Sequence, residues 1–423
     1  MKEDFLHYLW KYQLFDVSKL ISVHGQGVSI LKSGIHNHNT GPDFLNSKVE
    51  IANQLWFGNV EIHVKSSDWF KHKHEIDENY EAVILHVVWE YDSDIYLKNN
   101  TPVTTLELKK FVSKDVLNNY HNLSTKKIRW IPCEKELHTI DSFLLNNWLE
   151  RLFISRLEQK SKSIMLLLSE SKNHWEAVLF QLLAKNFGLK VNGESFLKLA
   201  KSIPFSVLKK EQNDITRLSA LFFGQAGFLS EIIEDYYHQE LKKEYEYLKH
   251  KYQLTPMLKK DFQFFRMRPS NFPTIRIVQL ISLYHKHHNL FSLLMELKSI
   301  NKLYQLLAVE VPEFWHNHFT FEKETKNNEK RLTKSFIDLL FINTIIPLQF
   351  CYQKSTNTLN EELLFEKMKA IKPEKNSIIS KFLEFKIESK NAFETQSLLE
   401  LKKNYCNVKR CLDCAIGDRL VRN

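Results

Sequence analysis

The sequence predicts an α+β protein, in which an N-terminal α/β sheet domain is followed by a large α-helical domain that ends in a cysteine-rich tail. Three observations predict this division. Segments with the two-residue alternation of half-buried strands fall before residue 115, whereas after residue 141 the apolar residues recur at helical spacing. Only 10 glycines are present, and none lies between Gly227 and Gly417. Turns that need glycine are therefore concentrated in the first domain.

The composition is ordinary for a globular protein, with 43% hydrophobic and 26% charged residues. A formal net charge of +9 permits a nucleic-acid partner without requiring one. The chain shows no secretory leader and no apolar run long enough to cross a bilayer. We therefore expect a cytoplasmic protein with reduced thiols and no membrane partner. The sequence does not specify an oligomeric state.

The first domain is expected to span residues 1–115. In chain order its pattern predicts a helix over 3–15, two short strands within 22–34, a hairpin of strands 49–57 and 60–65, a short helix near 67–72, and strands at 83–89 and 104–111. The hairpin turn is placed at Gly58–Asn59, a turn-forming pair between two alternating segments. Residues 83–89 are continuously apolar, which indicates a strand covered on both faces of the sheet.

A candidate site lies on the predicted hairpin. The alternation over residues 60–65 projects Glu61, His63 and Lys65 from one side of a strand. Asp43 lies at the entry to the preceding strand, directly after a proline. An aspartate and a glutamate on neighbouring strands can share a hard cation such as Mg²⁺ or Mn²⁺, which prefers oxygen ligands. His63 or Lys65 would then position the attacking water.

This pattern of Pro-Asp, a gap and Glu-x-His resembles the core of the PD-(D/E)xK nucleases, over residues 1–110. The resemblance implies that Asp43 and Glu61 are metal ligands and that the protein processes nucleic acid. His63 stands where these nucleases usually have lysine, and Lys65 lies one pleat further along. The resemblance therefore leaves the third role open between the two residues.

Nearly the whole chain also resembles a bacterial family of unknown function, the DUF2851 proteins. The shared marks are the sequences GPDF, VEIH, SDW-x-x-H-x-H, RPSNFPTIRI and a terminal Tyr-Cys followed by two further cysteines. This second resemblance implies a family without implying an activity.

Histidines in the first domain offer another interpretation, because imidazole is a ligand that suits Zn or Fe. The candidates are His36, His38, His63, His72, His74 and His86. His72 and His74 lie about 200° apart on a helix, so in the short helix expected near residues 67–72 they pair as ligands only if their segment is irregular. His86, on an apolar strand, is expected to be a core histidine. His63 shares a face with Glu61 and is the preferred functional candidate.

The second domain is expected to be helical over residues 136–423, after a polar linker at 116–135. Apolar stripes predict helices at 143–168 and 175–187. Residues 335–350 form the most apolar segment, but Asp338, Asn343 and Pro347 interrupt it. We expect a buried core helix there rather than a membrane span.

Three arginines, Arg266, Arg268 and Arg276, flank the sequence RPSNFP. Asn271 is expected to cap a helix whose first turn contains Pro273. Guanidinium groups beside a helix N-terminus would form a phosphate site for nucleic acid. The alternative is that the arginines bind carboxylates and hold the helical domain together.

Three of the five cysteines, Cys406, Cys411 and Cys414, lie within nine residues. Such crowding in a reducing compartment favours a metal over disulfides, and the spacing is that of thiolates on one Zn²⁺ or on an iron–sulfur cluster. A fourth ligand must come from Cys133 or Cys351, and Cys133 is preferred. Some PD-(D/E)xK exonucleases hold such a cluster with one upstream and three C-terminal cysteines, which is a similar layout. The alternative is a set of reduced, unligated thiols.

Three functions follow from these patterns. The leading hypothesis is a metal-dependent nuclease or a nuclease-like protein that processes nucleic acid. The second is a non-catalytic scaffold that keeps a degenerate nuclease-like core for binding. The third is a metallohydrolase that uses His63, His72 and His74 on a small substrate.

Overall fold

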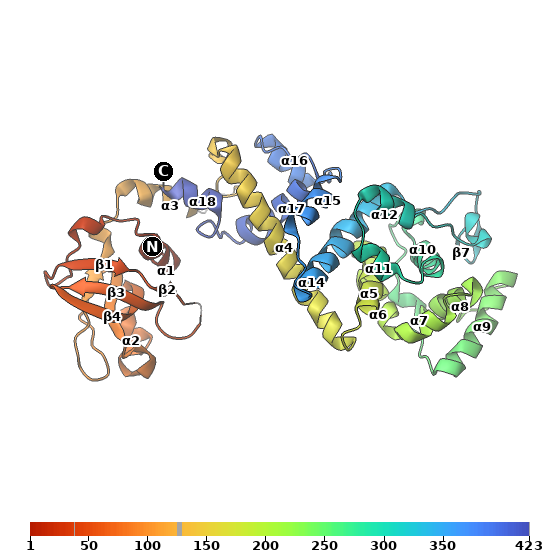
Figure 1. The fold of residues 1–423 in the computed structure, drawn as a ribbon, viewed down its shortest axis with the longest axis horizontal. Coiled ribbons are helices and arrows are strands. Elements are labelled where there is room, and N and C mark those ends of the chain that lie inside the picture. The colour runs from red at the N-terminus through yellow and green to blue at the C-terminus, as the bar shows by residue number, and fades with distance from the viewer. Residues whose placement is uncertain (38, 125–128, 423) are drawn as a thin grey trace. The chain divides into compact units, whose positions relative to one another are not determined.

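A computed structural model describes residues 1–37, 39–124 and 129–422. The α+β class is confirmed, with a six-stranded sheet near the N-terminus and helices through most of the remaining chain (Figure 1). The chain divides into a sheet unit, Met1–Trp148 with Leu401–Asn423, and a helical unit, Leu149–Glu400. The division thus follows Trp148 rather than residue 135, and the C-terminal tail belongs with the sheet unit.

The sheet is mixed, with strand order β1-β3-β4-β5-β6 and with β2 paired to β3. Strands β1, β2 and β4 pair antiparallel with β3, whereas β5 is parallel to both β4 and β6. The strands are β1 Val28–Lys32, β2 Ile35–His36, β3 Phe44–Ile51, β4 Gln54–Lys65, β5 Val83–Glu90 and β6 Thr105–Glu107. Strand β5 is central and largely buried, as its apolar sequence predicts.

The predicted hairpin turn at Gly58–Asn59 is wrong. The chain reverses at Ala52–Asn53, where both residues have positive φ angles of 52° and 62°, and β4 runs unbroken through Gly58. A Cβ at Gly58 would lie 2.5 Å from both the Ala82 carbonyl oxygen and the Ile84 side chain. Glycine is therefore needed there for the close approach of the chain entering β5, and not for a turn.

The connection from β4 to β5 crosses the sheet through three short helical turns. These are α2 Asp68–Lys71, η2 His74–Ile76 and η3 Glu78–Tyr80. Trp69 anchors the crossover in a core cluster with Tyr80, Val83, Ile95 and Val103. Burying the indole fixes the path of the segment that carries His72 and His74.

Three helices complete the sheet unit: α1 Glu3–Tyr12, α3 Lys114–Ser124 and α18 Ala415–Arg422. Helix α1 packs on β4, and α18 packs on α3 (Figure 1). The Tyr8 hydroxyl donates a 2.7 Å hydrogen bond to the Asp418 carboxylate, which joins the two ends of the chain. The expected linker at 116–135 thus begins inside α3, and its residues 125–128 lie outside the described residues.

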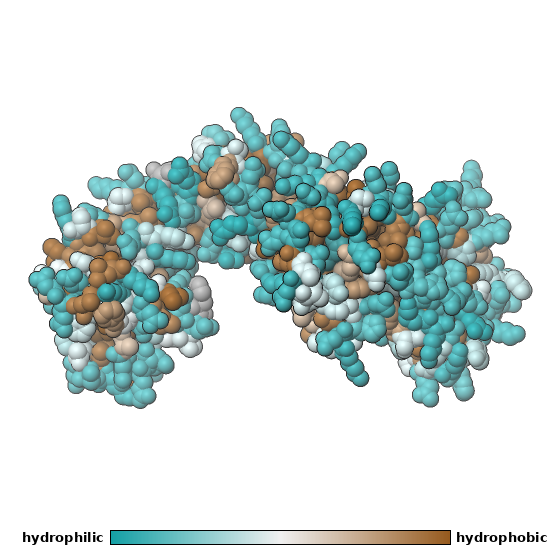
Figure 2. Space-filling view, viewed as in Figure 1, coloured by the Kyte–Doolittle hydropathy of each residue, from teal (hydrophilic) through white to brown (hydrophobic). Residues whose placement is uncertain are grey.

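The helical unit contains fourteen α-helices within the described residues, and α5 ends before Gly188 as predicted. They are α4 Ser142–Glu170, which starts in the sheet unit, α5 Trp175–Phe187, α6 Leu189–Ser202, α7 Phe205–Glu211, α8 Ile215–Gln225, α9 Tyr236–Tyr252, α10 Pro273–Lys286, α11 Leu290–Met295, α12 Ile300–Leu306, α13 Lys334–Leu340, α14 Ile346–Ser355, α15 Glu361–Lys369, α16 Ser377–Glu384 and α17 Ala392–Leu401. Figure 2 shows a largely hydrophilic surface over this unit on the face in view.

Residues Lys334–Ser355 form one long apolar helix, in which a π-helical turn joins α13 to α14. Its length and composition would suffice to cross a membrane, but 72% of its most apolar stretch is buried inside the structure. The expectation of a core helix in this segment is confirmed. The polar interruptions contribute to packing, since Asn343 accepts a hydrogen bond from Arg156.

Candidate metal centre

The structure brings the two predicted carboxylates, Asp43 and Glu61, together. Phe44 pairs with Val60 in the antiparallel ladder, which sets Asp43 beside Glu61. The Asp43 N–H donates a 3.0 Å hydrogen bond to Glu61 Oε2, and the Ile62 N–H donates a 3.0 Å hydrogen bond to Asp43 Oδ2. Each carboxylate therefore binds the backbone of the other strand, so their separation is fixed by the sheet rather than by flexible side chains.

Glu61 and His63 do not lie on a solvated polar face, contrary to the expectation from strand alternation. Their exposed fractions are only 5% and 1%, because the crossover to β5 covers this side of β4. Glu61 Oε1 lies 3.6 Å from His63 Nε2 and 3.3 Å from His74 Nε2. A carboxyl group so deeply buried needs a polar or cationic partner, which the imidazoles provide in part.

His63, His72 and His74 each present a nitrogen atom, and the three atoms lie within 4.8 Å of one another. Regular helical spacing argued against His72 and His74 as paired ligands. The two imidazoles nevertheless lie close together, because the backbone between them is irregular. Lys73 has a positive φ of 62° between α2 and η2, which turns both neighbouring imidazoles toward His63. We call His63, His72 and His74 the histidine group.

His63 is held in place by two further imidazole contacts. Its Nδ1 lies 2.8 Å from His86 Nε2, and its Nε2 lies 3.1 Å from His72 Nδ1. His86, which pairs with Glu61 in the ladder between β4 and β5, is fully buried. It thus lies behind the histidine group, where a partner that fixes the ring orientation of a metal ligand is usually found.

Burial favours the neutral form of the three buried imidazoles, those of His63, His74 and His86. It lowers the pKa of His63 to about 3, and the neighbouring His74 and His72 add to the effect. Burial also lowers the pKa of His74, and it lowers that of His86 well below the usual value. Neutral imidazole is the form that binds a metal ion, so a cation would not first have to displace a proton from these rings.

Glu61 is perturbed in the opposite sense. Burial, followed by the negative charge of Asp43, raises the pKa of its carboxyl group to about 9. Without a cation, therefore, Glu61 is protonated at neutral pH. A divalent ion among Asp43, Glu61 and the histidine group would reverse this shift, since it supplies the positive charge that the neutral imidazoles lack.

Helix α1 contributes two residues that the sequence analysis did not select. His7 Nε2 lies 3.1 Å from Asp43 Oδ2, and this contact raises the pKa of His7 despite burial. Glu3, four residues earlier and so on the same helix face, has a raised pKa from burial and the charge of Asp43. The available signal was the i, i+4 spacing of Glu3 and His7, which puts both residues on one face of the helix. His36 packs against His7 with 5.3 Å between ring centroids, and His38 lies outside the described residues.

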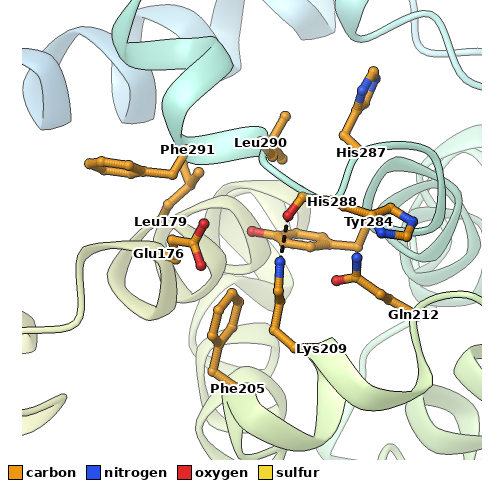
Figure 3. A pocket seen from close by; sticks show the side chains of 10 residues that line it. All are labelled: Glu176, Leu179, Phe205, Lys209, Gln212, Tyr284, His287, His288, Leu290 and Phe291. Atoms are coloured by element: carbon orange, nitrogen blue, oxygen red, sulfur yellow. Dashed lines mark hydrogen bonds between the residues drawn. The ribbon is translucent and has the colours of Figure 1, made fainter.

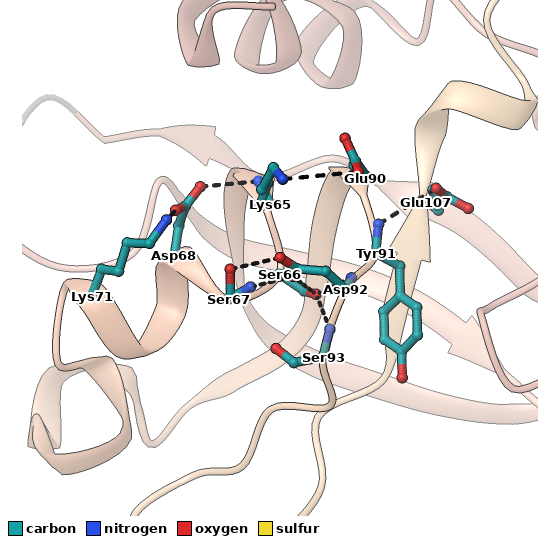
Figure 4. Close-up of polar contacts among 10 residues, drawn as sticks. All are labelled: Lys65, Ser66, Ser67, Asp68, Lys71, Glu90, Tyr91, Asp92, Ser93 and Glu107. Carbon is teal, nitrogen blue, oxygen red and sulfur yellow. Dashed lines mark hydrogen bonds and ion pairs between the residues drawn. The ribbon is translucent and has the colours of Figure 1, made fainter.

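Lys65 marks the edge of the centre (Figure 4). Its ammonium group lies 3.9 Å from Glu90 and is half exposed, and its backbone N–H donates to Asp68. Beside it, Asp92 accepts hydrogen bonds from the hydroxyl groups of Ser66 and Ser67, 2.8 Å each. This network holds the start of the crossover, so the Ser67 hydroxyl binds Asp92 and forms no cap hydrogen bond at α2.

The centre has an opening to solvent. The Asp43 side chain is 21% exposed, and His72 is exposed, whereas His63 and His74 are buried. Lys71 and Lys73 flank His72 on the exposed side of the crossover. The Lys71 ammonium is paired with Asp68, so Lys73 is the second positive charge beside the exposed His72.

The three arginines do not share one groove. Arg266 and Arg268 are exposed, but Arg276 is buried in α10, with its guanidinium 3.6 Å from the centroid of the Phe336 ring. Arg276 donates to Asn271 Oδ1 at 2.6 Å, so Asn271 does not cap the helix, which nevertheless begins at Pro273. The prediction that Arg276 contributes to a shared phosphate site is therefore wrong, because its guanidinium packs in the interior of the helical unit.

The cysteines that the sequence analysis selected lie in the sheet unit: Cys133, Cys406, Cys411 and Cys414. Cys351, the alternative fourth ligand, is buried in α14 of the helical unit. All five thiols are free.

A pocket in the helical unit also contains charged groups, among them Glu176, Lys209 and His288 (Figure 3). Lys209 reaches across it to donate to the His288 carbonyl oxygen, and the His287 ring contacts the Leu306 carbonyl oxygen at 2.8 Å. The Lys209 ammonium and the His287 ring are thus used in hydrogen bonds to backbone carbonyl groups, which hold the packing around this pocket.

These features define a class: a mixed α/β sheet unit with a buried carboxylate–histidine centre, joined to a largely helical unit with one small two-stranded sheet, β7 His318–Thr320 and β8 Lys323–Glu324. The chain belongs to the family described as "Protein of unknown function (DUF2851)", which matches residues 3–377. The matched range includes the carboxylate–histidine centre and ends before Cys406. No curated protein and no solved structure matches the chain.

Proposed function

We propose that the protein is a metal-dependent nuclease whose sheet unit hydrolyses phosphodiester bonds with a divalent ion held at Asp43 and Glu61. The observation that carries this proposal is the paired backbone anchoring of the two carboxylates beside the histidine group. Two carboxylates at one sheet position suit Mg²⁺ or Mn²⁺, and the adjacent imidazoles favour Mn²⁺ of the two.

The protein residues have distinct roles in this proposal. Asp43 and Glu61 ligate the ion, which when bound lowers the pKa of water and polarises a phosphoryl oxygen. His63, a neutral imidazole 3.6 Å from Glu61, ligates the ion or orients the water, and His86 fixes its ring. His7 holds Asp43 in place through the 3.1 Å contact. Lys65 is left with a peripheral role, since its described contacts are with Glu90 and Asp68.

A polyanionic substrate is supported by charge. The formal net charge is +9, and Lys71 and Lys73 flank the exposed His72. Arg266 and Arg268 are exposed in the helical unit and supply further phosphate contacts in this proposal. The five free cysteines are consistent with the cytoplasmic location inferred from the sequence.

A second candidate function rests on the histidine group itself. Three nitrogen atoms within 4.8 Å of one another, with Glu61 Oε1 near two of them, suit Zn²⁺ in a hydrolase acting on a small substrate. A third, non-catalytic scaffold would keep the same residues without turnover. The ion that supports cleavage separates these alternatives.

The test is cleavage of labelled single- and double-stranded DNA and RNA by the full-length protein, with Mg²⁺, Mn²⁺ or Zn²⁺ added after chelation. We expect cleavage with Mn²⁺, reduced by orders of magnitude in Asp43→Asn and Glu61→Gln. Glu50→Gln is the matched control, because it makes the same change on the neighbouring strand β3, away from the centre, and should cleave normally. Tight Zn²⁺ binding without nucleic-acid cleavage would favour the small-substrate hydrolase. No cleavage and no metal binding would favour the scaffold.

A further inference from the structure

Four free thiols from two distant stretches of sequence converge in the sheet unit. Cys133 precedes α4, Cys406 ends the π-helical turn η10 Lys402–Cys406, and Cys411 and Cys414 lie in the turn before α18. The Lys402 ammonium donates to the Trp130 carbonyl oxygen at 2.7 Å, which brings the stretch before Cys406 onto the stretch before Cys133.

The thiols also influence one another electrostatically. Burial raises the pKa of Cys133 and of Cys406, and neighbouring thiols raise it further in both cases. Burial and Cys414 raise the pKa of Cys411 to about 11. Cys133 and Cys414 are buried, and Cys406 and Cys411 are partly buried, so none of the four lies fully exposed to solvent as a reactive cysteine usually does. The arrangement suits a metal centre, whose positive charge stabilises all four as thiolates.

Local structure around Cys414 favours the thiolate form. Burial raises its pKa, and the nearby backbone N–H groups of Gly417 and Ile416 offset part of this rise. The turn is tight, since a Cβ at Gly417 would lie 2.0 Å from the Cys411 carbonyl oxygen. Hydrogen bonds from backbone N–H groups to cysteine sulfur are a known means of tuning iron–sulfur centres.

The spacing of the sulfur atoms distinguishes between metals. Tetrahedral ligation of one Zn²⁺, with Zn–S bonds of about 2.3 Å, puts every pair of sulfurs about 3.8 Å apart. Among the described residues, the histidine group is the one set of three ligand atoms found within 4.8 Å of one another. No three of the cysteine sulfurs in the described part of the chain meet this limit. A cluster of several iron atoms accommodates ligands that lie farther apart than the ligands of a single ion.

We propose that Cys133, Cys406, Cys411 and Cys414 hold an iron–sulfur cluster that fastens the C-terminal segment to the sheet unit. The cluster is independent of the nuclease proposal, because its ligands and the carboxylate–histidine centre share no residue. The cluster would, however, help to hold helix α1 in place beside that centre. Helix α18 follows Cys414 directly and binds α1 through Tyr8 and Asp418, and α1 carries Glu3 and His7.

The test is elemental and acid-labile sulfide analysis of the full-length protein purified without oxygen, with visible absorption and electron paramagnetic resonance after reduction. We expect iron and sulfide in equal amounts, either two or four of each per chain. Cys133→Ser should lose most of both, whereas Cys351→Ser, a buried thiol in the helical unit, should keep them. Limited proteolysis should cut residues 401–423 faster in Cys133→Ser than in Cys351→Ser.

Three results would overturn the proposal. One zinc per chain without sulfide would replace the cluster by a single ion. Wild-type protein with neither metal nor sulfide would mean unligated thiols. Iron retained in Cys133→Ser but lost in Cys351→Ser would show that Cys351, and not Cys133, is the fourth ligand. If Cys133→Ser does not fold, the wild-type stoichiometry still decides the first two outcomes.

Discussion

Metal binding at the carboxylate–histidine centre should release a proton from Glu61. Burial and Asp43 raise the pKa of this carboxyl group to about 9, so it is protonated before an ion binds, whereas a ligating carboxylate must be ionised. At pH 8 an ordinary imidazole, with a pKa of about 6.5, is already neutral. Glu61 should then supply about 0.9 proton per Mn²⁺ bound, and the apparent affinity should rise about tenfold per pH unit between pH 6 and 8.

The assay is calorimetric titration of Mn²⁺ into chelator-treated protein at pH 8, in buffers that differ in ionisation enthalpy. The slope of observed enthalpy against buffer enthalpy gives the number of protons released. Glu61→Gln has no proton to lose and should give a slope near zero, whereas Glu50→Gln should match the wild type. A wild-type slope near zero, or the same slope in Glu61→Gln, would refute the reasoning, because the ion would then bind without ionising Glu61.

Three further predictions concern the surrounding fold. Burial lowers the pKa of His63 to about 3, so its neutral form stabilises the metal-free protein fully above pH 6.5. As the pH falls toward 3, this contribution to the free energy of unfolding decreases by up to about 1.4 kcal/mol per pH unit. Denaturant unfolding of His63→Gln should therefore show a flatter dependence on pH. Gly58→Ala should destabilise the sheet unit by about 1–3 kcal/mol in the same measurement, because the added Cβ meets Ala82 and Ile84 at 2.5 Å. Gly27→Ala is the control, since a Cβ there has open space and should not destabilise the protein. Equal effects of the two variants would show that close approach of the chain is not why Gly58 is needed. Arg268→Glu should weaken nucleic-acid binding and reduce its salt dependence without changing the melting temperature. Arg276→Met should instead lower the melting temperature of the helical unit, because the buried guanidinium packs on Phe336. Weaker nucleic-acid binding in Arg276→Met, with an unchanged melting temperature, would mean that Arg276 contacts phosphate.

Sequence periodicity predicted the fold class because strand and helix periods occupy separate parts of the chain. It also predicted that Asp43 and Glu61 lie on neighbouring antiparallel strands, although it misplaced the turn between them. The error at Gly58 has a physical origin: glycine serves both turns and close backbone approach, and the sequence alone does not distinguish these uses. The positive φ angles at Ala52 and Asn53 mark the real turn.

The third hypothesis named the residues of the histidine group, but regular helical spacing argued against pairing His72 with His74. The geometry of the group depends on the positive φ of Lys73 and on the burial of Trp69, which together fold the crossover back over β4. Periodicity arguments assume regular backbone, and an irregular segment escapes them. His7 was missed for another reason: its relevance depends on how α1 packs on β4, which is a tertiary contact.

Anomalous diffraction from crystals grown with Mn²⁺ tests the central claim most directly, because it locates the ion without relying on turnover. The account predicts a strong peak in wild-type crystals about 2.1–2.3 Å from a carboxylate oxygen of both Asp43 and Glu61, with a nitrogen of the histidine group completing the coordination. The peak should be much weaker in Glu61→Gln, which keeps the other ligands but binds the ion less tightly. A peak on the histidines alone would support the small-substrate hydrolase. The absence of any peak near β3 and β4, with Mn²⁺ bound elsewhere, would contradict a metal-dependent function for this centre.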